Sequence, residues 1–118
     1  MKTCSAATVF AVRDLDEALK FYADVFGFVE DFRFGEYAGV RLGEVSIHLS
    51  QSPPSERPPG AGAVYIFCDE VDEFCREIRG KGARIGCEPK DWPYGMRDFV
   101  AYDLDGNQVS FGAESKNG

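Results

Sequence analysis

The chain has 118 residues, of which 44% are hydrophobic and 28% charged. This length suits a single domain and is too short for two independent cores, and no stretch reaches the roughly 20 apolar residues that a membrane helix requires. The formal net charge is −7 at pH 7, and no Lys/Arg cluster offsets it, so the chain repels phosphate backbones and anionic lipid. We therefore expect no nucleic-acid partner and no membrane partner.

The first half reads as a strand, a helix and three more strands. Residues 7–12 have the composition of a strand. A helix is predicted near 14–26, because Asp14 can cap it and Glu17 follows three residues later, as in a capping box. The apolar residues of this helix form one stripe, made of Leu15, Ala18, Leu19, Tyr22 and Val25. Strands are then expected at 28–34, 37–42 and 45–50.

The second half repeats this order. A strand is predicted at 63–67, a helix near 70–81 with Glu70 in the capping position, and strands at 84–88, 99–103 and 108–111, the last two joined by a turn at 105–107. Between the halves, 51–62 holds four of the six prolines and reads as a linker, extended and partly mobile. We expect an α+β fold in which two tandem βαβββ modules, 5–50 and 63–113, form one domain over 1–118, a cup-shaped mixed β-sheet assembly with the helices on its outer faces.

The cysteines and the N-terminus indicate a reducing compartment. Cys4, Cys68, Cys75 and Cys87 form no C-x-x-C pair, and the chain has one His, so no structural zinc site is expected. Cys75, on the apolar face of the second helix, and Cys68, at a strand end, are expected to be buried structural thiols. The first residues lead into strand-like sequence without an apolar leader, which predicts a cytoplasmic protein.

Two motifs carry a family resemblance. The segment VRDLDEALKFYADVFGF follows the first strand, and WPYGMRDFVAYDLDGN precedes the last. Together with the repeated βαβββ order, they are similar to the vicinal oxygen chelate superfamily of glyoxalase I, extradiol dioxygenases, fosfomycin-resistance enzymes and bleomycin-resistance proteins. The resemblance covers residues 5–113. Within the superfamily, the chain looks most like bleomycin-resistance proteins, because it is short, ends its fourth strand with a His-Leu pair and contains a W-x-Y-G segment. Those proteins hold no metal, so this resemblance implies none here.

The resemblance also identifies where a metal would be held. Enzymes of the superfamily take His, His or Gln, and Glu ligands from the first, fourth, fifth and eighth strands. The matching positions here are Ala7, His48, Ala63 and Ser110. A divalent ion needs about three protein ligands, so we expect no metal and no other cofactor, and we favour a protein without enzyme activity. The alternative is a metal-dependent lyase, glutathione or thiol transferase, or dioxygenase with ligands supplied elsewhere.

Strand alternation suggests which residues line a ligand site. In the fourth strand, Ile47 and its alternate neighbours face the helix, and His48 faces away, either as a pocket residue or as a purely structural His. In the fifth strand, Tyr65 and Phe67 face away from the helix. Trp92 and Tyr94 lie in a Pro/Gly loop that forms either a ligand rim or the edge of the core. The predicted ligand-binding set is Phe32, Ser46, His48, Tyr65, Phe67, Trp92, Tyr94, Asp98 and Ser110.

The leading functional hypothesis is a binding protein. Aromatic side chains would stack on a planar ligand, and acidic residues such as Asp31, Glu36 or Asp98 would attract positive charge, which fits a bleomycin-like drug and a role in antibiotic resistance. A third hypothesis is a regulatory or immunity-type module without a small ligand. Two short helices cannot cover eight strands, so exposed aromatic surface predicts a homodimer with a shared groove.

Overall fold

Two similar βαβββ modules make up the protein. The computed structural model describes residues 1–116. The first module contains β1 (Thr8–Val12), α1 (Leu15–Phe21), the π-helical turn η1 (Tyr22–Phe26), β2 (Val29–Phe34), β3 (Tyr37–Leu42) and β4 (Val45–Gln51). The second contains β5 (Ala63–Phe67), α2 (Val71–Gly80), β6 (Arg84–Asp91), β7 (Met96–Tyr102) and β8 (Gln108–Glu114).

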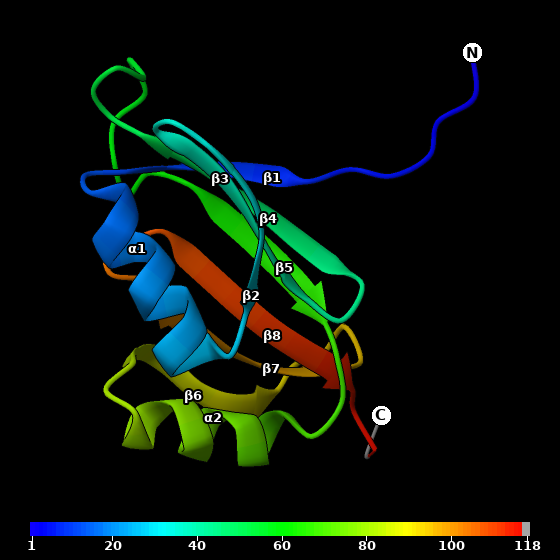
Figure 1. Ribbon diagram of the computed structural model, residues 1–118. Coiled ribbons are helices and arrows are strands. Elements are labelled where there is room, and N and C mark those ends of the chain that lie inside the picture. The colour runs from blue at the N-terminus through cyan, green and yellow to red at the C-terminus, as the bar shows by residue number, and fades with distance from the viewer. Residues whose placement is uncertain (117–118) are drawn as a thin grey trace.

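Each module forms its own four-stranded mixed sheet. The strand orders are β1-β4-β3-β2 and β5-β8-β7-β6, which we call sheet A and sheet B. In both sheets the first and last strands of the module pair in parallel, and the remaining neighbours are antiparallel. Figure 1 shows sheet A above sheet B, with α2 running beneath β6. The equivalent orders confirm the duplicated α+β fold predicted from the sequence.

The two helices begin differently. Asp14 caps α1, because its Oδ1 accepts a hydrogen bond from the Glu17 amide at 3.0 Å. The prediction that Glu70 caps α2 in the same way is wrong. Glu70 has a left-handed backbone with φ of 53°, and its side chain makes no capping bond. Neighbouring carboxyls, chiefly that of Glu73, raise the pKa of Glu70, so this residue stands at a strained and negatively charged helix start.

The helix-facing sides of both sheets share one hydrophobic core. Ile47 and Leu49 in sheet A and Val109 in sheet B are completely buried. Phe111 joins the modules, because its ring lies 6.1 Å from that of Phe26 and 4.9 Å from that of Phe74. Since the aliphatic faces meet in this core, the opposite face of each sheet points away from it. We call these opposite sides the open faces.

A buried polar junction ties the first module to the β7–β8 turn. The Asn107 side chain donates to the Ala11 carbonyl at 3.2 Å and accepts from the Gly62 amide at 2.9 Å. Its amide also donates to Asp103, which accepts a second bond from the Tyr22 hydroxyl, at 2.9 Å in each case. Burial, with Asp103 as a second cause, raises the pKa of Tyr22 well above its ordinary value, so this phenol stays protonated and donates.

Two smaller details differ from the sequence prediction. Cys75 is buried as expected, whereas Cys68 is exposed, because it follows β5 at the sheet end rather than lying under α2. The strands β6 and β8 each extend three residues further than predicted, and β7 starts three residues earlier, at Met96. No helix within residues 1–116 is long and apolar enough to cross a membrane.

Candidate functional site

The open face of sheet B holds a cluster centred on Asp98. The register places Asp98 on β7 opposite Gly112 on β8, and Ser110 opposite both Tyr65 and Val100. The Tyr65 hydroxyl donates to Asp98 Oδ2 at 2.8 Å, and the Tyr94 hydroxyl donates to the same oxygen at 2.7 Å. Asp98 is only 6% exposed although it lies on the open face. Two phenols thus hold one buried carboxylate.

A glycine makes the Tyr65 contact possible. The Tyr65 ring lies across Gly112, where a Cβ atom would overlap the phenol oxygen and lie 2.8 Å from Cε1. Any larger residue at 112 would occupy the path between the tyrosine and Asp98. The backbone here is not in a left-handed conformation, so the glycine is required for space rather than for its torsion angles.

The shared Asp98 carboxylate raises the pKa of both tyrosine hydroxyls. The hydrogen bond to Asp98 raises the pKa of Tyr94 to about 12. Burial first, and then the bond to Asp98, raise the pKa of Tyr65 well above its ordinary value. Both hydroxyls therefore remain protonated donors near neutral pH.

Trp92 forms an aromatic wall beside this cluster. Its ring is parallel to that of Tyr94, with an interplanar angle of 4° and a centroid distance of 6.1 Å. The Lys90 ammonium lies 4.3 Å from the centroid of the Trp92 ring, a cation–π contact. The Trp92 Nε1 atom is buried without a hydrogen-bond partner among the described residues. The loop therefore presents two stacked rings, one of which already carries a cation.

A second cluster lies on the open face of sheet A. Phe32 and Tyr37 stack with an angle of 24°, and the Phe32 ring meets the His48 ring edge-on at 5.0 Å. Tyr37 Oη lies 2.8 Å from His48 Nδ1. Phe32 lies across Gly39, as Tyr65 lies across Gly112, and a Cβ at position 39 would overlap the ring. The two modules use the same glycine-and-ring arrangement on equivalent faces.

The structure divides the predicted ligand-binding residues between the two sheets. His48, Phe32 and Ser46 lie on sheet A, and the other predicted residues lie on sheet B or in its β6–β7 loop. Within residues 1–116, no hydrogen bond or ring contact joins the two clusters. Four of the aromatic residues on the open faces and the β6–β7 loop are exposed, namely Phe34, Phe67, Tyr94 and Tyr65 at 81%, 76%, 63% and 37%.

At the four positions where the resemblance places metal ligands, this chain offers poor metal donors. Ala7 and Ala63 carry only methyl groups, and the hydroxyl of Ser110 accepts a hydrogen bond from Gln108 at 3.4 Å. The remaining donor, His48, is engaged by Tyr37 through Nδ1. No three His, Cys, Asp or Glu side chains in the described part of the chain are placed to hold an ion. This donor set does not fit a divalent metal.

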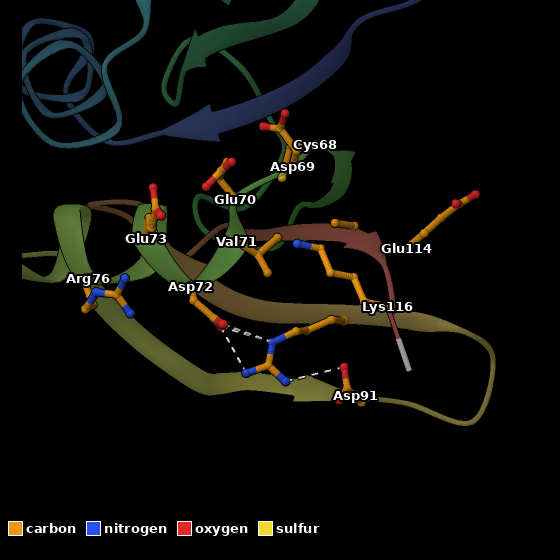
Figure 2. A pocket seen from close by; sticks show the side chains of 12 residues that line it. Cys68, Asp69, Glu70, Val71, Asp72, Glu73, Arg76, Asp91, Glu114 and Lys116 are labelled. Carbon is orange, nitrogen blue, oxygen red and sulfur yellow. Dashed lines mark hydrogen bonds and ion pairs between the residues drawn. The ribbon is translucent and has the colours of Figure 1, made fainter. Parts of the chain in front are cut away.

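Two surface cavities lie away from the Asp98 cluster. One of about 920 Å³ surrounds the start of α2 (Figure 2), and there Arg97 forms ion pairs with both Asp72 and Asp91. Six carboxylates and three basic side chains line it, and within residues 1–116 only Arg97 forms ion pairs with other lining residues. This cavity therefore lacks the largely apolar lining of a typical small-molecule pocket. The other, of about 500 Å³, runs between the β3–β4 turn and α2, and Phe67 is the one predicted ligand residue among its lining.

Sequence reasoning missed several members of these clusters. Tyr37 and Lys90 were not singled out, although the Tyr37 hydroxyl bonds His48 and the Lys90 ammonium lies over the Trp92 ring. Gly39 and Gly112 were also missed. A glycine inside an otherwise regular strand signals close approach of another group, and that signal was present in both strands.

Paired βαβββ modules, each with a polar and aromatic open face, define the class of protein. The sequence model of the Glyoxalase/Bleomycin resistance protein/Dioxygenase superfamily matches residues 6–111, and the chain belongs to that superfamily. A probable lactoylglutathione lyase of Synechocystis sp. is 28% identical over 117 residues, covering 86% of this chain and 88% of that protein.

Two solved structures of similar fold carry different functional names. The bleomycin-binding protein of Streptomyces verticillus, complexed with copper(II)-bleomycin, has 25% identity and a TM-score of 0.81, covering 98% of this chain and 99% of that one. A lactoylglutathione lyase from Agrobacterium tumefaciens has 25% identity and a TM-score of 0.79, covering 95% and 94%. The superfamily is thus established, and the choice between binding and catalysis depends on the site.

Proposed function

We propose that this protein is a metal-free binding protein that sequesters a flat aromatic or cationic small molecule, of which bleomycin is the first candidate. The proposal rests on the kinds of side chain that occupy the open faces. Aromatic rings and one buried carboxylate occupy them, while alanine and serine stand at three of the four metal-ligand positions. Aromatic walls with few polar groups are typical of sites for planar ligands.

The test compares ligand binding with metal content. Purified full-length protein is expected to gain thermal stability with bleomycin and with copper(II)-bleomycin, by the linkage between binding and unfolding. The gain should persist after EDTA treatment and dialysis when metal-free bleomycin is the ligand. Elemental analysis is expected to find well under one ion per chain. An ion bound stoichiometrically through His48 would contradict the metal-free part of the proposal, and no thermal shift with any planar ligand would favour a regulatory module.

The alternative is a lyase, thiol transferase or dioxygenase of the same superfamily. It is favoured by the likeness to lactoylglutathione lyases at 28% and 25% identity. Its test is formation or cleavage of lactoylglutathione after incubation with Zn²⁺ or Ni²⁺. Activity that disappears in His48→Ala and not in Cys68→Ala would support it. We expect no activity, because His48 lacks the companion ligands that a catalytic metal requires.

We also propose a homodimer whose groove is shared between subunits. The exposed aromatic residues lie on both open faces, and apolar patches of this kind are rarely left uncovered in monomers. An open face of each subunit would then close over its partner, with a two-fold interface as the simplest arrangement. Light scattering at micromolar concentration should give twice 13.0 kDa, and a mass near one chain would contradict the shared groove.

If the protein sequesters a drug in the cytoplasm, its expression should protect a sensitive host. Cells producing the wild-type chain are expected to tolerate more bleomycin than cells producing Trp92→Ala, at equal protein levels. Equal tolerance would separate binding in solution from a role in antibiotic resistance.

A further inference from the structure

Asp98 has unused hydrogen-bonding capacity at a buried position. Both tyrosine hydroxyls donate to Oδ2, and Oδ1 accepts no hydrogen bond from residues 1–116. A carboxylate can accept about four hydrogen bonds, so half of this group is left for another donor. Because Asp98 is 6% exposed and faces away from the core, any further donor to Oδ1, whether water or a ligand, approaches from the open side of sheet B.

No basic side chain within residues 1–116 forms an ion pair with this carboxylate. Asp98 forms no ion pair within the described residues, although Arg97 beside it bridges Asp72 and Asp91 on the helix side. Lys90 is the cross-strand neighbour of Asp98, yet its ammonium lies over the Trp92 ring. The two neutral phenols bond one oxygen of this carboxylate and leave its negative charge without a cationic partner.

The surroundings add a flat wall to this charge. Trp92 and Tyr94 stack in parallel at the edge of the cluster, and Tyr94 also holds Asp98. A ligand in contact with Asp98 would therefore also contact the rings of Tyr94 and Trp92. Lys90 shows that a cation is accommodated on that surface, since its nitrogen lies 4.3 Å from the ring centroid.

We infer that Asp98 is the anchor for a cationic nitrogen, an ammonium or amidinium group, carried by a flat aromatic ligand, and that Lys90 leaves Trp92 when this ligand binds. The inference rests on the proposed binding function and narrows it to cationic ligands. Tyr65 and Tyr94 act as positioning residues that orient Oδ1 outward. Neutral and anionic planar compounds lack the group that Asp98 requires.

The experiment uses two planar probes that differ in charge. 9-Aminoacridine is a cation at pH 7 and acridine-9-carboxylate is an anion, and both share one tricyclic ring. Isothermal titration of the full-length protein is expected to show binding of the cation at least about tenfold tighter than that of the anion. In Asp98→Asn the affinity for the cation should fall about 10- to 100-fold, as expected for a lost charged hydrogen bond, while that for the anion should not fall.

A substitution of Lys90 should change the affinity for the cation in the opposite direction to Asp98→Asn. Lys90→Met removes the internal cation and should raise the affinity for 9-aminoacridine about 2- to 5-fold. Asp24→Asn, an exposed carboxylate paired with Lys20 on the helix side, is the control for net charge and should change either affinity less than about twofold. Circular dichroism establishes that each variant is folded, and the comparison of probes on the wild type does not depend on any variant.

The outcomes separate this inference from the proposed function. Equal affinity for both probes, or an Asp98→Asn variant that binds the cation as the wild type does, would overturn the anchor and leave the proposed binding to the aromatic surface in place. Binding of neither probe would overturn both. Tight cation binding that is lost in Asp98→Asn and enhanced in Lys90→Met supports the anchor.

Discussion

Gly112→Ala offers a sharp test of the arrangement around Asp98. The new methyl group would overlap the phenol end of Tyr65. Tyr65 is 37% exposed, so its ring can swing outward instead of distorting the sheet. The hydrogen bond to Asp98 would then be lost, while Tyr94 would continue to hold the carboxylate.

The size of the effect follows from two opposing contributions. Loss of a hydrogen bond to a charged acceptor costs about 1.5 kcal/mol at a partly exposed site. Replacement of a strand glycine by alanine stabilises by about 0.5–1 kcal/mol, because less backbone entropy is lost on folding. The free energy of unfolding should therefore fall by about 0.5–1 kcal/mol in Gly112→Ala, by the difference of these two contributions.

The sign should reverse when Tyr65 is absent. In a Tyr65→Ala background no ring lies across position 112, so Gly112→Ala should stabilise by about 0.5–1 kcal/mol. Urea denaturation of the four proteins in this double-mutant cycle gives a coupling energy of about 1.5 kcal/mol. If Gly112→Ala has the same effect with and without Tyr65, the ring does not lie across the glycine and the described geometry is refuted.

Three further predictions concern stability and ionisation. Asn107→Ala should lower the free energy of unfolding by about 3 kcal/mol in urea titrations, since a completely buried side chain loses three hydrogen bonds, whereas exposed Gln108→Ala should cost about 0.5 kcal/mol or less; equal losses would contradict the buried junction. The absorbance of ionised tyrosine should reveal a Tyr94 pKa of about 12 that falls in Asp98→Asn. The Tyr94–Asp98 hydrogen bond should stabilise the fold fully below the unfolded tyrosine pKa of about 10, and this stabilisation is lost as the pH rises through about 12. A Tyr94 that titrates at the ordinary pKa of tyrosine would argue against this hydrogen bond. Glu70→Gly should raise Tm by about 3–5 °C in calorimetry, because glycine accepts the left-handed backbone without strain; a lower Tm would show that the Glu70 side chain stabilises α2.

The sequence predicted the fold well because the repeat is expressed in local patterns. The alternation in β4 separated buried Ile47 and Leu49 from His48, and in β5 it separated Ile66 from Tyr65. Such patterns depend only on the two-residue period of a strand. The order of elements then limited the topology to a duplicated α+β arrangement.

The assembly of the site depends on register, which local patterns do not specify. Asp98 meets Tyr65 because β7 and β8 pair Asp98 with Gly112, and a slip of one residue would turn Asp98 into the core. Glu70 misled the prediction for a related reason. Asp is a favoured N-cap, as Asp14 is here, but Glu is not, and at Glu70 the chain arrives with a left-handed turn and directs the side chain toward Glu73.

The shared core of the two modules has an evolutionary consequence. Folding energy comes from one side of each strand, where residues such as Val109 and Phe111 lie, while the residues that we propose to meet a ligand project from the other side. Mutations that redesign recognition can therefore accumulate on the open faces without using up the narrow stability margin of a small protein. A duplicated module of this kind can change its ligand, or exchange catalysis for ligand binding, while its architecture stays unchanged.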